Sequence, residues 1–362
     1  MKQRISTAEA EALYDSSDLL SLGRMADDKR KDLHPEGVVT YIIDRNINYT
    51  NICTSGCRFC AFYRKPNAAD GYLLSYDEIH EKIVETKNLD GVQILMQGGL
   101  HPTWKIGDYE TLLKRIKADF DIHLHAFSPP EVVHISKLSG IEIEETIKRL
   151  IDAGLNSIPG GGAEILVDRV RDEISSGKCS ATQWIEVMRV AHGLGLKTTA
   201  TMMYGHIETR AERILHMERI RELQDETGGF TAFIPWPFQP GNTDLENSSE
   251  ISGKAGEGLE YLKTVAISRL FLDNVPNIQA SWVTQGAKMA QMALYFGAND
   301  MGSTMIEENV VKAAGVGFRM SEKDIKRIIM DAGFVARRRR QDYTLIPDAD
   351  AVKNGETTLS VS

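Results

Sequence analysis

The feature that most constrains the fold of this chain is a regular alternation of apolar runs and amphipathic segments. The apolar runs are typical of buried strands, and the segments between them have the 3.6-residue spacing of amphipathic helices. Eight strand-and-helix units follow one another, with strands over residues 38–47, 91–99, 121–130, 155–164, 196–206, 230–240, 277–285 and 299–305. This alternation predicts an α/β fold with a parallel sheet, and eight units predict a closed (β/α)8 barrel of the TIM type.

Short capping motifs support the predicted helices. In a capping box, a Ser or Thr bonds the backbone three residues on, and a Glu or Gln at that position bonds back. This spacing is found for Ser75 and Glu78, Ser180 and Gln183, and Thr209 and Glu212. Gly154 follows an amphipathic segment and predicts a helix end, because glycine readily adopts the left-handed conformation that ends helices.

The eight units divide the chain into three parts. Residues 1–35 predict an N-terminal helical cap, residues 36–317 the barrel, and residues 318–362 a C-terminal extension of one helix and a tail. The polar stretch 242–257 predicts a surface loop. We expect the arginine run 337–340 to be a solvated edge of the tail, because a net charge of −9 disfavours a nucleic-acid-binding role.

Charge and hydropathy exclude several classes of partner. The net charge of −9 over 362 residues argues against nucleic acid and against an anionic membrane surface. No apolar run reaches the ~18 residues that a membrane helix needs, and the first residues lack the apolar core of a secretory signal. We therefore expect a cytoplasmic enzyme with neither a nucleic-acid nor a membrane partner. In a reducing compartment, clustered cysteines more often bind metal or do chemistry than form disulfides.

Three of the four cysteines lie close together after the first predicted strand. Cys53, Cys57 and Cys60 have C-x3-C-x2-C spacing, whereas Cys179 stands alone before a predicted helix. Thiolates are soft ligands of zinc and of iron–sulfur clusters. Structural zinc typically takes four ligands in pairs, and no second pair is present. Three thiolates can instead hold three irons of a [4Fe–4S] cubane and leave the fourth iron open to another ligand at the barrel mouth, where the active sites of such barrels lie.

The cysteine motif resembles the signature of the radical S-adenosylmethionine superfamily. The three cysteines follow the first strand, and an aromatic residue, Phe59, immediately precedes the last of them. The resemblance implies an enzyme in which the open iron of a [4Fe–4S] cluster chelates S-adenosylmethionine. It also implies that an electron cleaves this cofactor to a 5′-deoxyadenosyl radical, with a reductant such as flavodoxin or ferredoxin as partner.

The ends of the other predicted strands offer candidates for cofactor binding. A glycine pair at residues 98–99 suits a tight turn, and the resemblance implies that its backbone approaches the methionine amino group. It further implies an aromatic residue or backbone segment against the adenine, at Tyr63. Glu164 follows a glycine-rich strand end, where its carboxylate can accept hydrogen bonds from ribose hydroxyls or begin the next helix. The predicted cofactor-binding residues are Phe59, Tyr63, Gly98, Gly99, Ser128 and Glu164.

Ionisable and hydrogen-bonding side chains gather at the remaining strand ends. His123 and His125 lie two apart on one strand, so they point to the same side. We expect them to face inward as hydrogen-bonding groups, because no matching ligands for a zinc site occur at other strand ends. The candidates for acid–base or orienting roles are His125, Tyr204, His206, Glu208 and Asp300. The candidates for contact with a sugar-like substrate, with Trp282 as a stacking wall, are Gln239, Asn242, Thr243, Ser281, Trp282, Ser303 and Thr304.

Longer stretches resemble one subfamily of these radical enzymes over about residues 38–315. They are "NICTSGCRFCAFYR", "MQGGLHP", "LHAFSPPEV", "PGGGAEIL", "MMYGHIET", "LQDETGGFTAFIPW" and "YFGANDMGSTM". The subfamily contains enzymes of the futalosine pathway to menaquinone and the deazaflavin synthases. "FIPWPFQPGNT" and "ASWVTQG" most resemble its cyclising members, whose substrate is dehypoxanthine futalosine. The resemblance implies hydrogen abstraction from ribose C4′, addition of the sugar radical to the benzoate ring, and loss of one electron and one proton.

Two alternatives stay open from the sequence. A sister radical enzyme, either aminofutalosine synthase or a deazaflavin synthase component, shares much of the same sequence, including "LQDETGGF". A non-enzymatic iron–sulfur electron carrier or a zinc-stabilised binding protein would also use three clustered cysteines. The substrate turned over separates the first alternative, and cleavage of S-adenosylmethionine separates the second.

Overall fold

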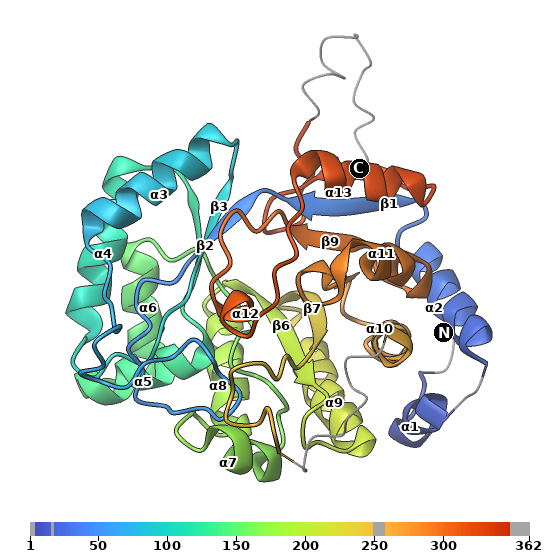
Figure 1. Ribbon diagram of the computed structural model, residues 1–362, viewed down its shortest axis with the longest axis horizontal. Helices are drawn as coiled ribbons and strands as arrows, with labels where there is room; N and C mark the ends of the chain where they lie inside the picture. Colours follow the sequence, from blue (N-terminus) through green and yellow to red (C-terminus); the bar gives the residue numbers. More distant parts are fainter. Residues whose placement is uncertain (1–3, 16–17, 249–257, 348–362) are drawn as a thin grey trace.

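The structure, a computed structural model, describes residues 4–15, 18–248 and 258–347 (Figure 1). Parts of the predicted loop 242–257 and of the predicted C-terminal tail therefore lie outside the described residues. The strands are β1 (Val38–Ile42), β2 (Asp44–Ile47), β3 (Gln93–Met96), β4 (His123–Ala126), β5 (Ser157–Ile158), β6 (Lys197–Tyr204), β7 (Phe230–Pro237), β8 (Asn277–Ile278), β9 (Asp300–Ser303) and β10 (Val335–Arg338). The helices are α1 (Thr7–Asp15), α2 (Leu19–Leu33), α3 (Tyr76–Asn88), α4 (Ile106–Asp119), α5 (Pro129–Ser139), α6 (Ile143–Ala153), α7 (Asp168–Ser175), α8 (Ala181–Gly193), α9 (Arg210–Thr227), α10 (Gly258–Phe271), α11 (Trp282–Ala293), the 3-10 turn η1 (Leu294–Phe296), α12 (Val310–Ala313) and α13 (Glu322–Asp331).

The strands form a closed parallel barrel. β2 to β8 pair in chain order, and β9 pairs with β1, which runs directly into β2. Backbone bonds join β8 to β9, because Asn299 N donates to Ile278 O (3.0 Å) and Ala280 N donates to Asp300 O (2.8 Å). The continuous segment β1–β2 thus makes a ring of eight strand positions with β3 to β9. This ring confirms the predicted (β/α)8 barrel.

Several outer helices begin or end where the sequence predicts, but α11 begins at Trp282, inside the stretch 277–285 that predicts a strand. The three predicted capping boxes are present at the N-termini of α3, α8 and α9. Gly154 ends α6 with a left-handed φ of 119°. The helices pack their apolar faces around fully buried side chains such as Trp184 and Phe233. Because the strands are parallel, the loops that follow their carboxyl ends lie together at one end of the barrel.

Both ends of the chain pack onto the barrel. α1 and α2 lie beside α9 and α10 at one side (Figure 1). At the other end of the chain, β10 pairs in parallel with β1, with Val335 opposite Val38. Among the described residues, no helix combines the length and apolar character that crossing a membrane would require.

The prediction that residues 337–340 form a solvated edge is wrong for Arg339. This side chain is buried, and its guanidinium donates to both carboxylate oxygens of Asp300, at 2.6 and 2.9 Å. It also lies 4.0 Å from the centre of the Tyr343 ring. Net charge could not reveal this arrangement, because the carboxylate that pairs with Arg339 lies 39 residues earlier in the chain.

Candidate active site

A cavity of about 410 Å³ lies among the strands and the loops that follow them. Side chains alternate along a strand, so every second residue faces this space. The strand residues that line it are Ile42, Asp44, Asn46, Gln93, Leu95, His125, Thr199, Thr201, Ile234, Trp236 and Ser303. Val310 and Val311 of α12 line it from the loop side, and Figure 1 shows α12 at the centre of the ring of outer helices. Most of the polar lining is uncharged, which suits hydrogen bonds to a small polar ligand.

The loop after β2 brings the three clustered cysteines to this cavity. Cys53, Cys57 and Cys60 all line it. The Cys53 sulfur accepts the backbone N–H of Leu100 at 3.2 Å, and the Ser55 hydroxyl lies 3.1 Å from the Cys57 sulfur. In the described part of the chain, no three His, Cys, Asp or Glu side chains converge as ligands of a single metal ion. A cubane cluster attaches each thiolate to a different iron, so its ligands need not converge on one point.

A half-buried lysine, Lys178, supplies positive charge beside the thiols. Burial raises the pKa of Cys57 to about 11, while the Lys178 ammonium acts to lower it. Burial opposes the charge on Lys178, but Cys57 and Glu164 outweigh it and raise the pKa of the ammonium. The ammonium bonds the Glu164 carboxylate at 2.7 Å and lies 4.9 Å from the centre of the Phe59 ring. Lys178 is not among the predicted site residues, because nothing in the sequence shows that the loop after α7 docks on the cysteine loop.

The glycine pair at residues 98–99 lies where no side chain fits. An added Cβ at Gly98 would be 2.6 Å from the Tyr49 ring, and one at Gly99 would be 2.2 Å from the Ile52 carbonyl oxygen. The buried carboxylate of Glu131 orients this segment, because it accepts the Gly98 N–H at 3.0 Å. The two glycines therefore let backbone, rather than side chains, form the wall beside the cysteines.

Ser128 and Glu131 act as a pair at the start of α5. Glu131 accepts both the N–H (2.8 Å) and the hydroxyl (2.6 Å) of Ser128. Ser128 lines the cavity as predicted, but its hydroxyl proton is committed to Glu131. The sequence analysis missed Glu131, although Ser128 and Glu131 have the capping-box spacing that signals such a pair.

Glu164 is a predicted cofactor-binding residue that keeps one carboxylate oxygen available to accept a hydrogen bond. It is 5% exposed and lines the cavity. One carboxylate oxygen bonds Lys178, whereas Oε2 is buried without a hydrogen-bond partner. The residue also has a left-handed φ of 41°, a strained conformation for a non-glycine residue that is typical of functional sites. Oε2 can therefore accept a hydrogen bond from a ligand hydroxyl.

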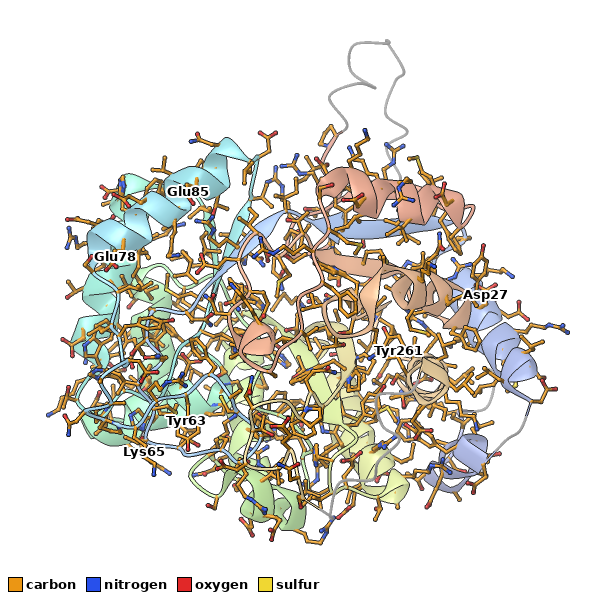
Figure 2. All side chains as sticks on the ribbon, viewed as in Figure 1. Asp27, Tyr63, Lys65, Glu78, Glu85 and Tyr261 are labelled. Carbon is orange, nitrogen blue, oxygen red and sulfur yellow. The ribbon has the colours of Figure 1, made fainter. Side chains whose placement is uncertain are left out.

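These features fit a three-cysteine cluster with a chelated ligand. The thiols face one cavity and a cation lies beside them. The glycine wall flanks the same space, as does the Glu164 Oε2 atom, which has no hydrogen bond and lies 3.9 Å from the Arg171 guanidinium. Phe59 and Tyr63 also line it, and Figure 2 shows Tyr63 on the cysteine loop, close to Lys65. Cys179 is buried and bonded to Arg171, and it does not line the cavity.

One of the five acid–base candidates, His125, lines the cavity. Its Nδ1 lies 2.7 Å from the Ser157 hydroxyl, and Nε2 of His123 lies 2.7 Å from the same oxygen. The two imidazoles therefore point to the same side of β4, as predicted. Burial holds the pKa of His125 well below its ordinary value, so the ring is neutral near pH 7.

Three of the candidates lie at the end of β6 or just after it, and their side chains are outside the cavity lining. Thr199 and Thr201 face inward, so Tyr204 has the opposite parity and points toward α9, where Arg213 covers its ring at 4.7 Å. Glu208 accepts the N–H of His206 at 2.9 Å and the Arg213 guanidinium at 2.7 Å. All three candidates are buried and none lines the cavity. The hydrogen bonds of His206 and Glu208 fix the turn into α9.

Asp300 is also held away from the cavity lining. Its carboxylate is fully buried and engaged by Arg339. The Thr40 hydroxyl donates to the same group. A carboxylate bound in this way is a structural anchor between β9, β1 and the C-terminal segment.

Two of the predicted substrate residues, Ser281 and Ser303, line the cavity. Gln239 and Thr243 bond carbonyls of their own loop, and Asn242 donates to Ala313 of α12 at 2.9 Å. Thr304 is buried and does not line the cavity.

The aromatic wall of the cavity is Trp236 rather than Trp282. Trp282 is 2% exposed, and its indole N–H donates to the Ser303 carbonyl at 3.0 Å. Trp236 lies on β7 two residues after Ile234, and both line the cavity. Strand alternation in "AFIPWPF" could have found Trp236.

The comparisons with known proteins agree with this geometry. The chain matches the Radical SAM superfamily over residues 47–220 and the CofH/MqnC C-terminal region over residues 227–352. It is 45% identical over 345 residues to cyclic dehypoxanthine futalosine synthase of Halalkalibacterium halodurans, covering 95% of this chain and 92% of that one. It is also 45% identical over 327 residues to a 5-amino-6-(D-ribitylamino)uracil–L-tyrosine 4-hydroxyphenyl transferase of Methanosarcina mazei, covering 89% and 86%.

Solved structures show the same fold at low identity. Methylornithine synthase has a TM-score of 0.70 at 17% identity, covering 93% of this chain and 95% of that one. The FeFe-hydrogenase maturase HydG of Carboxydothermus hydrogenoformans has a TM-score of 0.72 at 15% identity, covering 94% and 78%. Identities this low support the barrel fold alone.

The relatives and the three-thiol site lead to one assignment. Enzymes of this superfamily use a [4Fe–4S] cluster and S-adenosylmethionine, which are the two cofactors that the cysteine motif predicts. An electron carrier and a zinc-stabilised binding protein are thereby set aside. With relatives at 43 to 45% identity over nearly its whole length, this chain belongs to the radical S-adenosylmethionine superfamily of enzymes.

Proposed function

We propose that this enzyme cyclises dehypoxanthine futalosine to cyclic dehypoxanthine futalosine in menaquinone biosynthesis. The observation that carries the proposal is similarity over nearly the whole chain. The relatives named cyclic dehypoxanthine futalosine synthase in Halalkalibacterium halodurans and Streptomyces coelicolor are 45% and 43% identical over 95% and 94% of it.

The chemistry of the cavity supports this substrate. Amide and hydroxyl side chains line the middle of the barrel, and they can bond the hydroxyls of a ribose without charge. These residues are Asn46, Gln93, Thr199, Thr201 and Gln279. Phe62 and Trp236 supply aromatic surface for the benzoate ring.

The residues around the cysteines would hold the cofactors. When bound, the cluster and S-adenosylmethionine supply a 5′-deoxyadenosyl radical. Lys178 would offset the negative charge of the three thiolates, and Glu164 Oε2 would accept a hydrogen bond from a hydroxyl of the cofactor ribose. The open backbone at residues 98–99 leaves room for the methionine amino group. Val310 and Val311 of α12 add apolar side chains to the lining. A reductant such as flavodoxin or ferredoxin would supply the electron.

A second candidate is transfer of the tyrosine side chain to a ribitylaminouracil. Relatives so named reach 47% identity over 80% of this chain. Tyrosine brings an ammonium and a carboxylate, whereas dehypoxanthine futalosine brings one carboxylate. The charged groups that line the cavity away from the thiols are engaged, since Arg339 binds Asp300, and Asp44 accepts Gln93 at 2.7 Å. Because these charged groups already have partners, the cavity favours dehypoxanthine futalosine, which needs fewer charged partners than tyrosine.

Anaerobic turnover with each substrate tests the proposal. The enzyme receives reductant, S-adenosylmethionine and either dehypoxanthine futalosine or tyrosine with 5-amino-6-(D-ribitylamino)uracil, and mass spectrometry identifies the products. We expect a product two hydrogen atoms lighter than dehypoxanthine futalosine, and none from tyrosine. A tyrosine adduct would instead support the transferase, and turnover of a carboxyvinyloxy-benzoate would support aminofutalosine synthase. The Cys57→Ala variant should cleave no S-adenosylmethionine, and cleavage by it would overturn the cluster assignment.

A further inference from the structure

Three side chains connect the cavity to the opposite end of the barrel. His125 faces the cavity, Ser157 is buried behind it on β5, and His123 begins β4 near the amino-terminal ends of the strands. Both imidazoles lie 2.7 Å from the single Ser157 hydroxyl oxygen. The three groups therefore form one continuous hydrogen-bonded row along the inside of the barrel.

Gln341 determines the direction in which the hydrogen bonds of this row are donated. Its side-chain nitrogen lies 3.3 Å from Nε2 of His125 and can only donate, so Nε2 is the accepting nitrogen of the ring. The proton of neutral His125 is then on Nδ1 and is donated to Ser157. The Ser157 hydroxyl in turn donates to Nε2 of His123. Each donor faces an acceptor, and every link points away from the cavity.

The end of the row at His123 lies near solvent. His123 is half-buried, and the exposed carboxylate of Asp342 acts on it electrostatically. The Lys117 ammonium opposes Asp342 at His123, and the Arg339 guanidinium faces His125. Burial is the main influence and lowers the pKa of His123 to about 4. Both rings are thus neutral near pH 7 and can accept a proton, and neither retains it.

We propose that His125, Ser157 and His123 form a proton relay that carries the proton released by the substrate from the cavity to Asp342 and solvent. The proton takes the Nε2 lone pair of His125 in place of the Gln341 N–H. The Nδ1 proton then passes to Ser157, which passes its own proton to His123, and His123 releases its other ring proton to solvent. His125 is the residue that would touch the substrate, and Ser157 and His123 act through it as positioning residues.

The source of the proton rests on the proposed function. After the ribose radical has added to the benzoate ring, the C–H bond at the new junction breaks. Its proton goes to His125, its electron pair rejoins the ring π system, and one electron leaves to a one-electron acceptor of the iron–sulfur class. Charge and atoms then balance only if the proton has a way out. His125 lines the cavity with an accepting nitrogen, whereas the Asp44 carboxylate in the same lining already accepts the Gln93 amide at 2.7 Å.

The coupling of product to 5′-deoxyadenosine tests the relay in the loaded enzyme. We expect Ser157→Ala to cleave S-adenosylmethionine but to form at least about tenfold less cyclised product per 5′-deoxyadenosine. Ser157→Thr keeps the hydroxyl and should restore the ratio. The matched control is His192→Phe, because His192 also lies between two hydroxyls, those of Thr198 and Thr227, both at 2.7 Å, and lines no part of the cavity. An unchanged ratio in Ser157→Ala would overturn the proposal.

A measurement on the full chain without substrate separates the relay from the proposed function. ¹⁵N NMR of labelled histidines should show His125 as the Nδ1–H tautomer, and Ser157→Ala should shift the His123 and His125 signals together. An Nε2–H tautomer of His125 would overturn the relay whatever the substrate is. If the relay tautomer is seen but dehypoxanthine futalosine gives no product, the proposed function fails, and the coupling ratio is then measured with the substrate that turns over.

Discussion

The Lys178 ammonium lies 2.7 Å from the Glu164 carboxylate, and the thiols of Cys57 and Cys60 act on it electrostatically. The residues of this pair are 14 positions apart. The last turn of α7, just before Lys178, packs on the cysteine loop, where Arg58 N donates to Ile174 O at 2.9 Å. One cation thereby serves two groups of negative charge. It offsets thiolates that burial alone would keep protonated, and it fixes the carboxylate that faces the cofactor site.

Replacing this cation should impair cofactor cleavage. We expect Lys178→Met to lower 5′-deoxyadenosine formation at least about tenfold, since a buried carboxylate loses its partner. Liquid chromatography of anaerobic reactions measures the rate. The control is Lys65→Met, because Lys65 is exposed on the cysteine loop (Figure 2). Equal rates in both variants would show that Lys178 has no part in the site.

The open backbone at Gly99 should be essential for cluster binding. In Gly99→Ala the new methyl would meet the Ile52 carbonyl at 2.2 Å, so the cysteine loop must shift at a cost of about 1–3 kcal/mol. We expect a severalfold loss of iron per chain after reconstitution, measured by metal analysis. Gly107→Ala on α4 is the matched control, because nothing lies within 4 Å of its added Cβ. Full iron content in Gly99→Ala would contradict the close approach.

The Cys57 thiol should react with a strong dependence on pH in the metal-free protein. Burial raises its pKa to about 11, so the thiolate fraction grows about tenfold per pH unit up to that value. Peptide mapping after brief iodoacetamide treatment should show this rise between about pH 8 and 10. In Lys178→Met the rate at each pH should be lower, because Lys178 lowers this pKa. A rate that levels off near pH 8.5, the ordinary thiol pKa, would contradict the prediction.

Asp300 should matter for stability rather than as a base. Removing one partner of a buried ion pair costs roughly 3–5 kcal/mol, so Asp300→Asn should lower the free energy of unfolding by about this amount in urea titration. Arg339→Met should do likewise, and the double variant should lose less than the sum of the two. A fully stable Asp300→Asn protein without turnover would instead identify Asp300 as a catalytic base.

Substitutions of the two tryptophans near the cavity should have different effects, one on substrate binding and the other on stability. Trp236 lines the cavity, so Trp236→Ala should raise KM for the substrate severalfold and change stability little. Trp282 is buried beside β9, so Trp282→Ala should cost roughly 3–5 kcal/mol of unfolding free energy. Steady-state kinetics with denaturant titration measures both. The opposite pattern would place the substrate wall at Trp282.

The barrel and the family that the cysteine motif indicates were predictable because their signals are local. Alternating apolar runs, capping boxes such as Ser75 with Glu78, and the C-x3-C-x2-C motif each lie within a short segment. Strand parity is equally local, and it could have placed Trp236 inside and Tyr204 outside. Lys178, Arg339 and Ser157 could not be found in this way, because their partners come from distant segments that only the closed ring brings together.

The sequence by itself determined the eight-unit barrel, the three-cysteine motif and the class of chemistry, since periodicity and cysteine spacing are properties of neighbouring residues. Tertiary structure decided which strand-end residues reach the cavity. It placed His125 at the cavity, but it used Glu208 and Asp300 to bind Arg213 and Arg339. The physical reason is burial: a carboxylate withdrawn from water needs a partner, and only the folded chain determines which cation lies within reach.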